Sequence, residues 1–196
     1  MKKILCKYAL VIFALALLSG CGSTPVSDGG LFEDLFSCAK NGNYQDSTAA
    51  LIMLSNMDLS IDEISRIKSG YINEKDEEKR LHYVYVLAKR TQEQRYIDQF
   101  VDSAAMNQSF VIKNDSRWVS IVSPLYQMLA YYSKGSDGDK ALAAIMRLID
   151  DADGVVLGSI ADDLYAIYSL NPERLIRIAN QENIDMNKIK YLFDQE

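Results

Sequence analysis

The stretch Lys140–Ala179, KALAAIMRLIDDADGVVLGSIADDLYAIYSLNPERLIRIA, decides the fold class. Its apolar residues recur at the spacing of one helical face, and turn formers interrupt them. The pattern predicts one helix over 141–149 and a second over 155–170. Asn171-Pro172-Glu173 then supplies an N-cap, a first-turn proline and an acid for a third helix over 174–179. Three consecutive helices joined by short turns indicate an all-α chain.

Helix signals continue toward the N-terminus. Ser60-Ile61-Asp62-Glu63 and Thr91-Gln92-Glu93-Gln94 both have the form of capping boxes, which begin helices. Gly70 is expected to end the first of these helices. Asp46 is expected to cap an earlier helix over 48–54.

A further helix is expected after a cap at Asn114 or Asp115, with Trp118 on its apolar face. Pro124 falls inside it and should kink it or split it in two. The run 110–112 is the only one with strand character, and three residues without a partner do not form a sheet.

These signals predict about eight or nine short helices joined by tight turns, which favours antiparallel packing of neighbours. Their apolar faces are incomplete alone and have to stack on one another. The chain therefore resembles HEAT-like and other α-solenoid proteins, arrays of short antiparallel helical hairpins, most closely over 140–179. No repeat period holds across the chain, so a compact orthogonal helical bundle is the alternative fold.

The first twenty residues have the features of an export signal. Lys2, Lys3 and Lys7 form a positive region, and residues 8–18 follow without a charge. This apolar run is too short to cross a bilayer, which needs roughly 20 residues. Residues 1–20 are therefore predicted to be a signal peptide.

Leu18-Ser19-Gly20-Cys21 ends this segment and resembles the lipobox of bacterial lipoproteins. In that family the cysteine thiol receives a diacylglycerol, a signal peptidase cleaves before it, and the new amino terminus is usually acylated, as by palmitate. The resemblance covers residues 1–23 and implies a lipid anchor on Cys21. Gly22, where an aspartate retains such proteins at the inner membrane, implies an outer-membrane lipoprotein facing the periplasm in a Gram-negative organism.

The predicted mature chain is acidic. Residues 21–30 form the lipidated cysteine and a short flexible tether, and 31–196 form a single all-helical domain. Loss of three lysines with the signal leaves 18 basic against 27 acidic residues, a formal charge of −9. This balance argues against nucleic acid and favours a basic protein partner.

The cysteines predict no disulfide in the mature chain. Cys6 leaves with the signal peptide and Cys21 carries the lipid, so Cys38 has no intramolecular partner. Cys38 lies in a short apolar segment and is expected to be a small buried side chain.

Catalytic and cofactor motifs are missing from the sequence. His82 is the only histidine, inside a predicted helix, and is expected at the helix surface or the edge of the core. The acidic loops 150–154 and 137–139 do not have the spacing of a calcium loop and are interpreted as helix ends. No Gly-rich phosphate loop is present. We expect no enzyme activity, metal, cofactor or nucleotide.

Tyrosine is frequent, with twelve residues in the chain. Tyr131, Tyr132, Tyr165 and Tyr168 lie in predicted helices of the C-terminal half. They are the candidate interaction surface, because tyrosine offers rigid contact area with a polar tip. Core packing explains the same spacing.

The leading hypothesis is a membrane-anchored envelope lipoprotein that binds a protein or peptide without catalysis. An immunity or inhibitor protein against a basic toxin or hydrolase is one version of it. An envelope assembly scaffold is an alternative. A cell-wall enzyme that uses carboxylates, such as Asp162-Asp163 or the cluster 74–78, is another.

Lipidation can be tested by replacing Cys21 with serine. Since the cysteine thiol receives the lipid, Cys21→Ser should abolish acylation and leave the unprocessed precursor. Palmitate labelling and the mass of the product measure both effects. A Cys21→Ser protein that still matures at the same position would show the assignment to be wrong.

Overall fold

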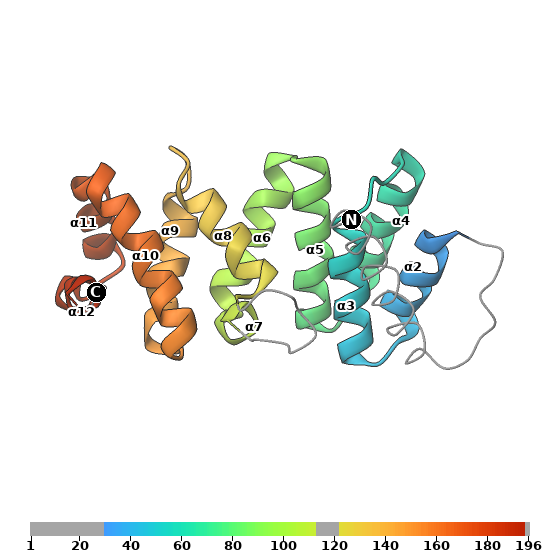
Figure 1. Cartoon of the computed structure of the whole chain (residues 1–196). Coiled ribbons are helices and arrows are strands. Elements are labelled where there is room, and N and C mark those ends of the chain that lie inside the picture. The colour runs from blue at the N-terminus through green and yellow to red at the C-terminus, as the bar shows by residue number, and fades with distance from the viewer. Residues whose placement is uncertain (1–29, 113–121, 195–196) are drawn as a thin grey trace, which may run out of the picture. The chain divides into compact units, whose positions relative to one another are not determined.

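The computed structural model describes residues 30–112 and 122–194, and this part of the chain is all-α, as predicted (Figure 1). No strand occurs within these two ranges. The run 110–112 belongs to a short helix, α7 (Gln108–Ile112). None of the helices in the described ranges is long and apolar enough to cross a membrane.

The chain divides into two compact units, Met1–Gln92 and Glu93–Glu196. Consecutive helices pack on each other within both units, in the pairs α2 with α3, α4 with α5, α8 with α9, and α10 with α11. The predicted HEAT-like repeat and the predicted single domain over residues 31–196 stay predictions.

In the first unit, one helix lies at the centre of the packing. The helices are α2 (Leu31–Asn41), α3 (Tyr44–Leu54), α4 (Ile61–Asn73) and α5 (Glu77–Thr91). Both α3 and α4 pack on α5, and α2 packs on α3 and α4. Every residue of α5 from Leu81 to Ala88 is buried. A helix that is apolar around its whole circumference has to be covered by other elements, which explains the position of α5.

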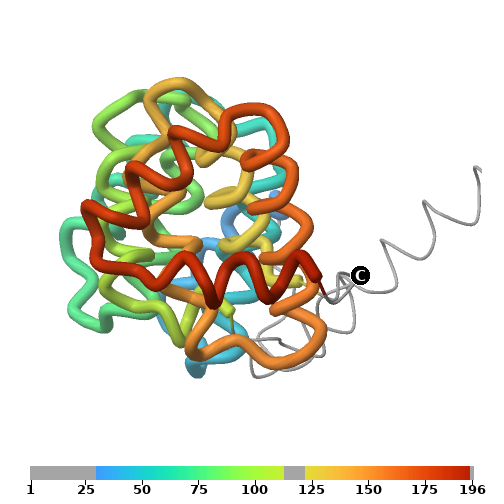
Figure 2. Tube along the Cα trace, turned by 90° about the vertical axis from the view of Figure 1, so that its left-hand side faces the viewer, coloured from blue at the N-terminus to red at the C-terminus, as the bar shows by residue number. Residues whose placement is uncertain are grey.

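In the second unit, α9 lies at the centre of the packing. The remaining elements are α6 (Gln94–Met106), α8 (Pro124–Ser133), α9 (Asp139–Arg147), the 3-10 turn η1 (Leu148–Asp150), α10 (Gly154–Leu170), α11 (Pro172–Gln181) and α12 (Met186–Phe193). Residues 141–146 of α9 are all buried, and α6, α8, α10 and α11 pack around it. The helices α11 and α12 both pack on α10 at the C-terminal end of the unit (Figures 1 and 2).

Two predicted helix starts are confirmed. Ser60 forms a full capping box, because Glu63 N donates to Ser60 Oγ at 3.3 Å and Ser60 N donates to Glu63 Oε2 at 2.7 Å. Asn171 caps α11 by accepting from Arg174 N at 3.0 Å, with Pro172 in the first turn. Both signals are local, so short-range sequence determines them.

Other predicted starts are wrong. The cap of α3 is Asn43, which accepts from Asp46 N at 2.9 Å, so Asp46 lies in the first turn. Thr91 does not open a helix but ends α5, where its hydroxyl donates to Leu87 O at 2.8 Å. The cap position of α6 is Glu93, whose side chain makes no capping hydrogen bond to that helix.

Pro124 is the first residue of α8 rather than an interior one, and Ser123 caps that helix. Proline is tolerated at this position because the backbone N–H groups of the first turn have no partner within the helix, so the missing N–H of proline costs no hydrogen bond. Asn114, Asp115 and Trp118 lie outside the described residues.

Gly70 does not end its helix, since α4 continues to Asn73. A Cβ built on Gly70 would lie 2.6 Å from Cε1 of Tyr83 in α5. The glycine therefore permits the close approach of a buried tyrosine ring, which local sequence does not reveal.

Replacing Gly70 with alanine should destabilise the protein by about 1–3 kcal/mol, because the added methyl overpacks a rigid ring. Gly158 is the matched control: it is exposed within α10, and nothing lies within 4 Å of a Cβ at that position. Gly158→Ala should stabilise by about 0.5–1 kcal/mol through helix propensity. Urea denaturation measures both variants, and equal effects of the two would contradict the packing role of Gly70.

Candidate functional site

A hollow with a volume of about 780 Å³ lies in the second unit. It is formed by the segment after α8, the start of α9, the end of α10 and the first turns of α11. Its lining residues are Lys134, Ser136, Asp139, Ala166, Ile167, Leu170, Asn171, Glu173, Arg174 and Arg177. The volume is in the range of small-ligand and peptide pockets.

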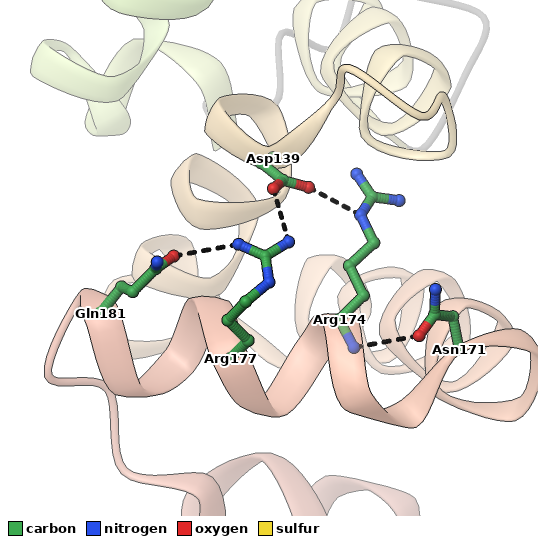
Figure 3. A network of polar contacts seen from close by, with 5 residues as sticks. All are labelled: Asp139, Asn171, Arg174, Arg177 and Gln181. Carbon is green, nitrogen blue, oxygen red and sulfur yellow. Dashed lines mark hydrogen bonds and ion pairs between the residues drawn. The ribbon is translucent and has the colours of Figure 1, made fainter.

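At this hollow the carboxylate of Asp139 accepts hydrogen bonds from two arginines, Arg174 and Arg177 (Figure 3). Arg174 Nε donates to Asp139 Oδ1 and Arg177 Nη2 donates to Asp139 Oδ2, both at 2.7 Å. Arg177 Nη1 also donates to Gln181 Oε1 at 3.2 Å. The two arginines share a face because they lie three residues apart on α11. Asp139, the first residue of α9, therefore joins two helices.

The charges of this cluster stabilise the ionised carboxylate. Burial alone would raise the pKa of Asp139, but hydrogen bonds from Arg177 and Arg174 and their positive charges hold that pKa below its ordinary value of 3.8. The side chain of Arg174 is only 13% exposed. Its Nη2 atom is buried and has no hydrogen-bond partner among the described residues.

The lining of the hollow carries positive charge in excess. Three cations, Lys134, Arg174 and Arg177, stand against two carboxylates, Asp139 and Glu173. The whole chain, by contrast, has a net charge of −6. Lys134 is paired with Asp163 at 2.9 Å. Apolar side chains of α10 complete the wall, so the hollow combines charged side chains with an apolar surface.

A nucleophile with an adjacent base is not seen at this hollow. Ser136 is the one hydroxyl in its lining. The chain's single histidine, His82, belongs to the first unit. It is 1% exposed, with Nδ1 2.7 Å from Glu78 O, so it lies deeper in the core than predicted. No group of three or more potential metal ligands occurs within the described ranges.

The first unit has a smaller hollow of about 540 Å³, whose lining includes Arg66 and Tyr83. The guanidinium of Arg66 lies 4.9 Å from the ring centroids of Phe32 and Phe36 and is paired with Glu33. Burial, with a contribution from the charge of Glu74, raises the pKa of Tyr83 to about 12. The arginine is therefore engaged by Glu33, and the phenol of Tyr83 stays neutral at physiological pH.

The four predicted tyrosines lie in two pairs. Tyr131 and Tyr132 on α8 contact edge to face, with ring centroids 5.4 Å apart. Tyr165 and Tyr168 on α10 both contact Phe193 of α12, at 5.4 and 5.5 Å. Tyr131 is 70% exposed and Tyr165 51%. The second pair thus helps to attach α12, whereas Tyr131 is displayed to solvent.

The acidic loops are helix ends, as interpreted from the sequence. Asp150 pairs with Lys188 at 2.7 Å, and Asp153 caps α10. Asp139, however, was missed as a site residue, together with Arg174 and Arg177. Their pairing joins residues 35 and 38 positions apart, which no local pattern encodes. The sequence offered one indication of this cluster: Arg174 and Arg177 are three residues apart, which places both on one face of a helix.

Cys38 is disulfide-bonded and half-buried. The expectation that it has no intramolecular partner concerns the mature chain and stays a prediction. That expectation assumed that Cys6 is removed and that lipid occupies Cys21, and both of these residues lie outside the described ranges.

No family model, no curated protein and no solved structure matches this chain.

Asp139→Asn keeps the shape of the side chain and removes its charge. We expect a loss of about 0.5–1 kcal/mol in the free energy of unfolding at pH 7, because the site is partly exposed and screened. The lowered pKa of Asp139 in the folded state means that its contribution is present above pH 3.8 and is lost as the pH falls through the folded pKa. The difference from wild type should therefore disappear in acid.

Asp150→Asn is the control, since the Asp150–Lys188 pair is more than half exposed on both sides. It should change the free energy by less than about 0.5 kcal/mol. Urea titrations at pH 7 and pH 3 compare the two variants, and an Asp139→Asn deficit that persists unchanged at pH 3 would contradict the electrostatic explanation.

Proposed function

We propose that this chain is a bacterial envelope lipoprotein, anchored through lipid on Cys21, whose helical part binds a protein or peptide without catalysis. In a Gram-negative cell it lies at the outer membrane and faces the periplasm. The lipobox-like segment Leu18-Ser19-Gly20-Cys21, placed where the apolar run ends, supports the anchor.

The observation that carries the binding function is the hollow of about 780 Å³ in the second unit. Lys134, the C-cap of α8, lines it, and Tyr131 lies three residues earlier, in the last turn of that helix. Tyr131 is 70% exposed. Exposed tyrosines and concave surfaces with a few charged groups are both typical of recognition sites.

Several candidate catalytic carboxylates have structural partners, which favours binding over catalysis. Asp163 accepts from Tyr126 Oη at 2.8 Å and pairs with Lys134 at 2.9 Å. Glu74 accepts from the backbone N–H of Asp76 at 3.0 Å, and Asp76 caps α5. Acids engaged in this way stabilise helix ends and interhelical contacts.

An immunity or inhibitor protein is the specific version of this proposal. The mature charge of −9 favours a basic partner, such as a toxin or hydrolase, over long distances. A stable scaffold complex differs from it in requiring a fixed stoichiometry with its partner.

A photo-crosslinking amino acid at position 131 of the full chain, expressed in its own cells, tests the binding function. It should yield a discrete crosslinked protein. Position 72 is the control, because Ile72 is 76% exposed and belongs to the first unit. Denaturing gels and mass spectrometry identify the products. Equal, diffuse crosslinking from both positions, or none from position 131, would count against the proposal.

A further inference from the structure

The arginines at the hollow have unused hydrogen-bond capacity. A guanidinium carries five N–H donors in a planar fork. Among the described residues, Arg174 uses one of them, on Asp139, and Arg177 uses two, on Asp139 and Gln181. The side chain of Arg177 is 50% exposed and lines the hollow. Such forks match the two oxygens of a carboxylate.

An exposed aliphatic side chain lies in the same lining. Leu170, the last residue of α10, is 88% exposed. Ala166 and Ile167 line the same wall. The excess positive charge and the apolar wall together match a ligand group that carries a carboxylate next to an aliphatic chain. The end of a polypeptide with an aliphatic last residue has this chemistry.

We propose that the hollow of the second unit binds the C-terminal carboxylate of a peptide whose last side chain is aliphatic. Arg177 binds the carboxylate, with Arg174 beside it, and Leu170 and Ile167 contact the last side chain. Asp139 is a positioning residue that orients both guanidinium groups. This inference rests on the proposed binding function and names the chemistry of the group that is recognised.

The local charge explains why an acidic chain recognises an acidic group. Long-range attraction depends on the net charge of the partner, whereas the hollow selects a single carboxylate at short range. A basic protein with a free aliphatic C-terminus satisfies both conditions.

The test uses two probes and the full mature chain in detergent. The probes are the peptide N-acetyl-Ala-Ala-Leu with a free carboxylate and the same peptide with a C-terminal amide. Isothermal titration calorimetry measures their affinities. We expect saturable binding of the acid and at least tenfold weaker binding of the amide, about 1.4 kcal/mol. Equal affinities, or no binding of the acid at millimolar concentration, would overturn the inference.

Variants locate the site. Arg177→Gln should weaken binding of the acid at least tenfold. Arg147→Gln is the matched control: Arg147 also makes an ion pair, with Glu182, but does not line the hollow. Leu170→Asp should weaken binding as strongly without unfolding the protein, because Leu170 is exposed. An unchanged affinity in Leu170→Asp and in folded Arg177→Gln would overturn the site.

Inorganic phosphate separates a peptide site from a general anion site. Phosphate at 10 mM should leave most of the peptide bound, since it lacks the aliphatic contact. If phosphate binds and neither peptide does, the proposal is overturned. Crosslinking from position 131 that is retained while the peptide acid does not bind would reject this inference alone; loss of both would reject the proposed function as well.

Discussion

The burial of one helix on all sides organises each unit of this protein. In the first unit this helix is α5, and in the second it is α9. A helix can be surrounded in this way because its backbone groups hydrogen-bond internally, so that only side chains have to match the neighbours. In α9, three alanines at 141, 143 and 144 let the surrounding helices approach closely. The remaining helices need only one apolar face each.

This constraint also positions the candidate site. Asp139 begins α9, so its backbone is fixed by a helix that is buried directly after it. Helix α11 packs on α9 and brings Arg174 and Arg177 to the carboxylate. The polar cluster at the hollow is thus a consequence of core packing, with no loop needed to support it. Sites on helices keep their geometry better than sites on loops.

The sequence predicted what short-range physics controls. The all-α class, the Ser60 capping box and the Asn171-Pro172 start follow from periodicity and capping within a few residues. Gly70 was misinterpreted because its close contact is with Tyr83 of another helix. For the same reason the Asp139 cluster was missed and tyrosines were chosen instead, since contacts between helices depend on packing that one segment does not encode.

Asp139 also fixes the conformations of the two arginines at the hollow in the protein without a ligand. Long, flexible arginine side chains lose rotamer freedom when they bind a partner, and this loss opposes association. Here the carboxylate has already ordered both guanidinium groups as the protein folds. The entropy is therefore lost during folding, and the ligand that we propose would meet a preorganised surface.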